Sequence, residues 1–163
     1  MISNKIYICF RIPPTAKIIR HESTIHLQLV QGQYLGNPQK HWNWFYESSY
    51  GRMRKMKGAH MIYKAGGKTG EEIKSGDKIY LVTKNPIVSN YNCLFRKRND
   101  YIYYSLAASV DDQKWWSIDG EIWNGGKVRL QHEGKYLAAY ESWARAIEKE
   151  PDHSSTWIIT KED

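Results

Sequence analysis

The chain has 163 residues, of which 41% are hydrophobic and 13% aromatic, and its 24 Lys and Arg against 17 Asp and Glu give a net charge of +7. This composition excludes global disorder, the length predicts one domain, and two cysteines exclude a disulfide-dense scaffold or a four-cysteine zinc site. No apolar run approaches the roughly 18 residues of a membrane span, and no export signal or Asn-x-Ser/Thr sequon is visible, so we expect a cytoplasmic protein.

Short strands are predicted along most of the chain. After an N-terminal arm over residues 1–19, alternating apolar and polar residues predict strands at 24–29, 78–82 and 127–131. Gly, Asn, Asp and Ser follow each strand within a few residues, as hairpins require. The most helix-like window, residues 141–149, is short and stops before a proline. This pattern predicts an all-β sandwich or barrel.

A repeated pattern runs through these strands. Residues 128–137 match residues 79–88 at every apolar position without a gap, and residues 27–35 follow the same pattern with one residue fewer in the turn. An aromatic strand closes each unit, at Trp116 and Trp157, with a weaker counterpart at residues 61–63. We therefore predict three repeats of about 50 residues, approximately 20–72, 73–121 and 122–163, around a pseudo-threefold axis with one shared core. The residues predicted to point inward are Leu27, Leu29, Leu35, Ile79, Leu81, Val88, Trp116, Val128, Leu130, Leu137 and Trp157.

The last repeat, residues 125–139 closed by Trp157, resembles the repeat of fascin-like and hisactophilin-like β-trefoils. Residues 74–132 are similar to the MIR domain of stromal cell-derived factor proteins, protein mannosyltransferases and ryanodine receptors. Residues 113–115 resemble the Gln-x-Trp motif of ricin-B-type lectins, which occurs here once. The resemblance covers roughly residues 20–160 and implies that residues 1–163 form a single all-β domain, a β-trefoil. Trefoils host many functions, so the fold does not select one.

The candidate binding residues lie mainly in three places. Residues 40–57 hold five aromatic and five cationic side chains, residues 96–104 have a similar composition, and residues 140–145 form a loop with Tyr140, Trp143 and Arg145. Aromatic faces can stack on sugar rings or bases, while Arg and Lys bind sulfate, phosphate or carboxylate. The alternative places every second aromatic residue in the core and the cations on a solvated face. The candidate ligand-binding residues are Trp42, Trp44, Tyr46, Arg52, Arg54, Lys55, Arg96, Arg98, Asn124, Tyr140 and Trp143, of which Asn124 suits a turn equally well.

No motif predicts an enzyme, a cofactor or a metal site. Residues 65–69 resemble the end of a phosphate-binding P-loop, but Ile62 stands where its first glycine is required. The adjacent carboxylates at 71–72 and 111–112 would point to opposite sides of a strand, which disfavours a shared acid–base site. Cys9 and Cys93 lie among apolar residues, where buried thiols are expected.

The favoured function is that of a non-enzymatic, lectin-like module that binds a glycan or glycoconjugate. Acidic or sulfated glycans are the candidates for its preferred ligands. The alternative is a fascin-like actin-associated protein, or a module that binds an acidic protein, nucleic acid or an acidic membrane surface through residues 40–57. A proteinase-inhibitor or cytokine-like trefoil is less favoured, because such proteins normally act outside the cell.

Overall fold

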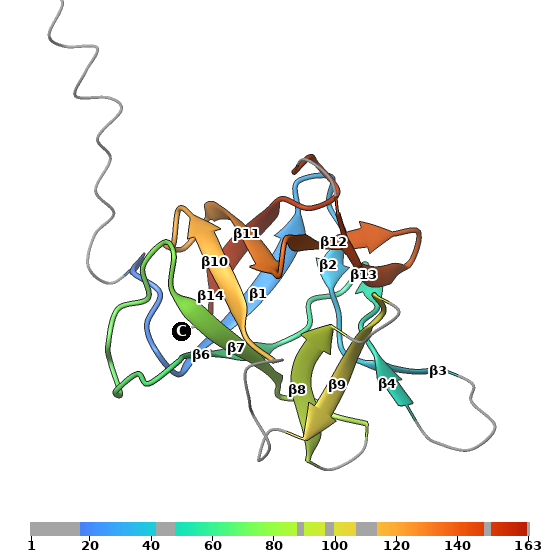
Figure 1. The fold of residues 1–163 in the computed structure, drawn as a ribbon, viewed down its shortest axis with the longest axis horizontal. Helices are drawn as coiled ribbons and strands as arrows, with labels where there is room; N and C mark the ends of the chain where they lie inside the picture. Colours follow the sequence, from blue (N-terminus) through green and yellow to red (C-terminus); the bar gives the residue numbers. More distant parts are fainter. Residues whose placement is uncertain are drawn as a thin grey trace, which may run out of the picture.

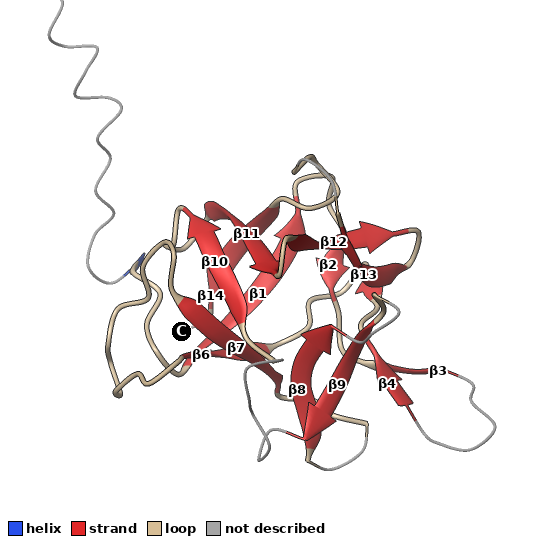
Figure 2. Ribbon diagram, viewed as in Figure 1, coloured by secondary structure: helices blue, strands red, loops and turns tan. Residues whose placement is uncertain are grey.

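The computed structural model describes residues 17–41, 48–87, 90–96, 100–106, 114–148 and 151–162. This part of the chain contains fourteen strands and no α-helix (Figures 1 and 2). No helix among these residues could therefore cross a membrane. In chain order the strands are β1 (Ser23–Leu29), β2 (Tyr34–Leu35), β3 (Gln39–His41), β4 (Ser48–Tyr50), β5 (Met53–Arg54), β6 (His60–Lys64), β7 (Lys78–Thr83), β8 (Tyr91–Arg96), β9 (Ile102–Leu106), β10 (Trp116–Gly120), β11 (Gly126–His132), β12 (Lys135–Tyr140), β13 (Trp143–Ile147) and β14 (Trp157–Lys161).

Six of the strands close into a barrel. β1 pairs with β6, β6 with β7, β7 with β10, β10 with β11, β11 with β14, and β14 with β1, all antiparallel. Closure leaves none of these six strands with a free edge. The other strands pair outside the ring, β2 with β5, β3 with β4, β8 with β9 and β12 with β13 (Figure 1). The prediction of an all-β fold is confirmed.

The inward-facing positions predicted from the alternating pattern fill the core. In β11, for example, Val128 and Leu130 are buried while Lys127 and Arg129 are exposed. The side chains predicted inward that are at most 1% exposed are Leu27, Leu29, Leu35, Ile79, Leu81, Trp116, Val128, Leu130, Leu137 and Trp157, and Val88 lies outside the described residues. The two buried indoles each satisfy their polar N–H on a backbone carbonyl, Trp116 on Leu94 and Trp157 on Leu137.

The strand pairing matches residues of β1 to those of β7 and β11 differently from the predicted alignment. Trp116 lies opposite Ile79 and Trp157 opposite Val128. In the same relation, His60 lies opposite Ile25. Within the predicted three-repeat arrangement, this pairing would make Ile25, two residues before the predicted Leu27, the counterpart of Ile79 and Val128, and His60 the counterpart of the tryptophans. The sequence does not distinguish the two alignments, because Ile25, Leu27 and Leu29 all alternate with the same period and a histidine does not resemble an aromatic closing residue.

Residues 141–149, the most helix-like window of the sequence, begin with a turn and continue as strand β13. Ala144 and Ala146 are buried and alternate with the half-buried Trp143, Arg145 and Ile147. Pairing with β12 along the whole of β13 outweighs the helix propensity of Ala, Arg and Glu. As a result, Trp143 and Arg145 point to the same side of the sheet.

Candidate functional site

Three segments that are far apart in the sequence meet beside the barrel. Residues 50–53 follow from the last residue of β4, and residues 100–103 lead into β9. Residues 140–145 include the turn between β12 and β13. Backbone hydrogen bonds join them, among them that of Ala144 N–H to the Gly51 carbonyl at 3.0 Å. Gly51 permits this close approach, since a Cβ atom there would lie only 3.0 Å from the Cβ of Ala144. The segments therefore hold their side chains in fixed relative positions.

Two arginines stack on aromatic rings at this junction. The guanidinium carbon of Arg52 lies 4.4 Å from the centroid of the Trp143 ring. That of Arg145 lies 4.6 Å from the ring centroid of Tyr101 and 5.1 Å from that of Tyr140. All three distances are within the about 6 Å range of cation–π attraction. We call these five residues the aromatic–arginine surface.

Tyr50 packs beneath this surface and holds it in place. Its ring makes edge contacts with Trp143, Tyr101 and Tyr103 at centroid distances of 5.9, 6.0 and 4.1 Å. Its hydroxyl hydrogen-bonds the Tyr103 hydroxyl. Burial, together with this hydrogen bond, raises the pKa of Tyr50 well above its ordinary value, so the phenol is neutral at physiological pH. Tyr140, by contrast, is 53% exposed, so the surface has a buried base and an open rim.

The guanidinium groups of Arg52 and Arg145 have no ion pair or hydrogen bond within the described part of the chain. The nearby Arg54, by contrast, is occupied. Arg54 donates to the Asn37 carbonyl and to Gln39 Oε1 at 3.2 and 3.1 Å. Stacking on a ring leaves the edge N–H groups of a guanidinium available, so the surface can donate hydrogen bonds to an anion or to hydroxyl groups.

The structure brings together three of the predicted site residues, Arg52, Tyr140 and Trp143. The others that are described lie elsewhere. Arg96 pairs with Asp100 at 3.4 Å and with Glu133 at 3.1 Å. Arg54 forms the hydrogen bonds given above, and Lys55 is exposed. Asn124 Oδ1 accepts the Lys161 N–H at 2.8 Å. Trp42, Trp44, Tyr46 and Arg98 lie outside the described residues.

The set of predicted site residues omitted Tyr101 and Arg145, which complete the surface. Arg145 carried a signal, because it follows Trp143 at the two-residue spacing that places side chains on one face of a strand. Tyr101 belongs to the predicted segment 96–104 but was not distinguished from its other aromatic residues, since only the bridge between Tyr101 and Arg145 brings it near the β12–β13 turn. A contact between segments over 40 residues apart in sequence is not visible in local spacing.

No protein-family model matches the sequence, and no curated protein matches it. Solved structures do resemble the fold. An SDF2-like protein from Arabidopsis thaliana superposes with a TM-score of 0.68 and 16% identity, over 88% of this chain and 94% of that one. Lysenin in complex with phosphocholine gives 0.65 and 14% identity, over 90% and 47% of the two chains.

A structure of botulinum neurotoxin type C, whose cell entry depends on interaction with two ganglioside molecules, gives a TM-score of 0.64 and 9% identity. The match covers 98% of this chain and 48% of the toxin chain. The chain thus spans about half the length of the lysenin and neurotoxin chains. At these identities the likeness concerns the fold alone. Together with the closed six-stranded barrel it identifies an all-β, β-trefoil-like fold.

Proposed function

We propose that this protein is a non-enzymatic binding module that recognises carbohydrate through the aromatic–arginine surface, with preference for glycans that carry carboxylate or sulfate groups. The observation that carries this proposal is the pair of stacked guanidiniums, Arg52 on Trp143 and Arg145 between Tyr101 and Tyr140. An exposed aromatic face packs against the apolar side of a sugar ring. The free N–H groups beside it match the oxygens of a carboxylate or sulfate.

The solved structures with a similar fold support a binding role, because lysenin is seen with phosphocholine and the neurotoxin interacts with gangliosides. The three-repeat arrangement is part of the same proposal. It is supported by the equivalent places of His60, Trp116 and Trp157 in the strand pairing. If one repeat carries one shallow site, a single sugar would bind weakly and several sugars on one surface more tightly.

A glycan array that includes neutral, sialylated, uronic-acid-containing and sulfated glycans tests the proposal, with matched variants read side by side. Tyr140→Ala and Arg145→Gln should each weaken binding by about tenfold or more. Tyr91→Ala and Arg129→Gln remove an exposed tyrosine and an exposed arginine elsewhere, and should leave binding within about twofold.

Two results would contradict the proposal. One is a folded protein that binds no glycan on the array. The other is tight binding of single-stranded RNA that falls steeply between two salt concentrations, because that dependence marks contacts to phosphate.

A further inference from the structure

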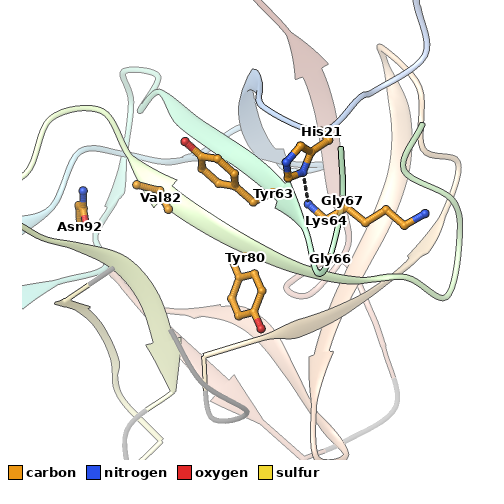
Figure 3. A pocket seen from close by; sticks show the side chains of 8 residues that line it. All are labelled: His21, Tyr63, Lys64, Gly66, Gly67, Tyr80, Val82 and Asn92. Carbon is orange, nitrogen blue, oxygen red and sulfur yellow. Dashed lines mark hydrogen bonds between the residues drawn. The ribbon is translucent and has the colours of Figure 1, made fainter. Parts of the chain in front are cut away.

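A pocket of about 450 Å³ lies away from the aromatic–arginine surface, on strands β6, β7 and β8. Figure 3 shows His21, Lys64 and Gly67 at one end, Asn92 at the other, and Tyr63, Val82 and Tyr80 between them. No residue of the aromatic–arginine surface lines it. Its volume lies within the range of about 300–1,000 Å³ that is usual for small-ligand sites.

Two tyrosines form the walls of this pocket. Tyr63 of β6 and Tyr80 of β7 stand directly opposite each other in the antiparallel ladder, and both are half-buried. Val82 lies on the same side of β7 as Tyr80, two residues further on. The ring of His21 meets that of Tyr63 edge-on at 5.5 Å. The pocket therefore offers aromatic and apolar walls that could stack on one sugar ring.

The described residues that line the pocket provide no free positive charge. Lys64 is the one lining residue with a cationic side chain, and its Nζ forms ion pairs with Glu71 and with Asp77, the latter at 3.6 Å. These two carboxylates also raise the pKa of Lys64. Because the charge of Lys64 is already compensated, an anionic ligand would gain little here. No carboxylate is among the described residues that line the pocket, so a ligand ammonium group would find no counter-ion among them either.

A neutral hydrogen-bonding side chain, that of Asn92, lines the far end of the pocket. Its Oδ1 is buried and has no hydrogen-bond partner in the described part of the chain. That oxygen is inaccessible to solvent, so a ligand hydroxyl would reach it only after the Asn92 side chain turned toward the pocket, and the hydrogen bond formed there would remove the cost of the unpaired oxygen. At the other end, both ring nitrogens of His21 are engaged, since Nδ1 accepts the Lys64 N–H at 2.8 Å and Nε2 lies 3.4 Å from Glu22 Oε1.

We propose that this pocket binds one neutral sugar residue of hexose size, with its ring on Tyr63 and Tyr80 and a hydroxyl group donating to Asn92 Oδ1 once that side chain has turned toward the ligand. Aromatic walls and uncharged polar groups select a neutral polyol over an acidic sugar or an amine. The site is independent of the proposed function, because the two sets of residues do not overlap. It would bind a hexose free in solution or at the end of a glycan chain by the same contacts.

The test is a titration of the full-length protein, followed by two-dimensional 1H–15N NMR, with glucose, galactose, mannose and N-acetylglucosamine, and with glucuronate and choline as charged probes. At least one neutral sugar should shift the amide signals of Tyr63, Tyr80 and Asn92 with a Kd of about 1–20 mM. Glucuronate and choline should bind these residues at least about tenfold more weakly.

Val82→Trp fills the pocket and should raise the Kd for the neutral sugar by about tenfold or more. Val30→Trp replaces an exposed valine elsewhere with a larger side chain and should leave the Kd for the neutral sugar unchanged. Tyr80→Ala serves as a second variant if Val82→Trp gives a poorly dispersed spectrum. Arg145→Gln should leave this binding intact, so a failure of the glycan array and a failure of this pocket are read separately.

Three results would overturn the assignment. The first is a folded wild-type protein whose pocket signals do not move with any neutral sugar. The second is sugar binding that persists in both Val82→Trp and Tyr80→Ala. The third is glucuronate or choline binding the pocket as tightly as the neutral sugars.

Discussion

His60 lies fully buried at the start of β6, opposite Ile25 of β1, and it makes the stability of the fold depend on pH. Its Nε2 hydrogen-bonds the hydroxyl of the buried Tyr104 at 2.8 Å. Burial, aided slightly by the nearby His26, lowers the pKa of His60 from 6.5 to about 4. The ring is therefore neutral in the folded protein and becomes protonated on unfolding at mildly acidic pH.

The sign and size of the effect follow from this shift. Above pH 6.5 the imidazole is neutral in both the folded and unfolded states, so its ionisation costs nothing. As the pH falls below 6.5 the unfolded chain takes up a proton that the folded chain does not, and the free energy of unfolding decreases. The decrease continues until about pH 4, where the folded state is protonated as well. Between pH 7 and pH 4 the loss amounts to about 3 kcal/mol.

Urea unfolding followed by tryptophan fluorescence, from pH 7 to pH 4, measures this loss in the wild type and in His60→Leu. The variant should be less stable at pH 7 by about 1–3 kcal/mol, because the Tyr104 hydroxyl loses its partner. The stability difference between the two proteins should then shrink by about 3 kcal/mol at pH 4, since all other titrating groups are shared. His153→Gln changes an exposed histidine and should follow the wild type throughout. Parallel profiles for the wild type and His60→Leu would refute the reasoning.

Three further substitutions test the packing and the surface. Gly51→Ala places a Cβ 3.0 Å from that of Ala144, so we expect the free energy of unfolding, measured in urea, to fall by about 1–3 kcal/mol. An unchanged midpoint would show that residues 50–53 and 140–145 can move apart at no cost. Trp157→Phe removes the indole N–H that donates to the Leu137 carbonyl at 2.9 Å. It should reduce the free energy of unfolding by about 1–3 kcal/mol and so lower the melting temperature, and equal melting temperatures would disprove this expectation. Arg52→Lys keeps the charge but loses planar stacking, and should weaken binding of an acidic glycan by about tenfold, which full retention in the same assay would contradict.

The barrel could be predicted from the sequence because one face of each of its strands is buried. In β7, for example, Ile79 and Leu81 are buried while Tyr80 and Val82 are only half-buried, so the two-residue period is visible in the order of apolar residues along the sequence. The same reasoning could not align β1 with the other strands, since Ile25, Leu27 and Leu29 offer two equivalent registers. Only the partner strands β6 and β14 decide between them.

The candidate site could be predicted only in part. Tyr140 and Trp143 could be predicted together because they flank one short turn, Tyr140 at the end of β12 and Trp143 at the start of β13. The stacking of Arg52 on Trp143 depends on a bridge between segments about 90 residues apart, and no local pattern encodes it. The pocket beside Tyr63 depends in the same way on the pairing of β6 with β7 and on His21, which comes from before β1.

The central claim is that acidic glycans bind at the aromatic–arginine surface. The most direct measurement is an NMR titration with a heparin-derived tetrasaccharide, with sialyllactose as a second ligand, that follows the indole N–H of Trp143 and the side-chain N–H groups of Arg52 and Arg145. The account predicts that these signals shift together and saturate with one Kd, and that Arg145→Gln weakens binding by about tenfold or more while Arg129→Gln does not. Saturable binding that leaves these signals unmoved, or no binding by the folded protein, would contradict it.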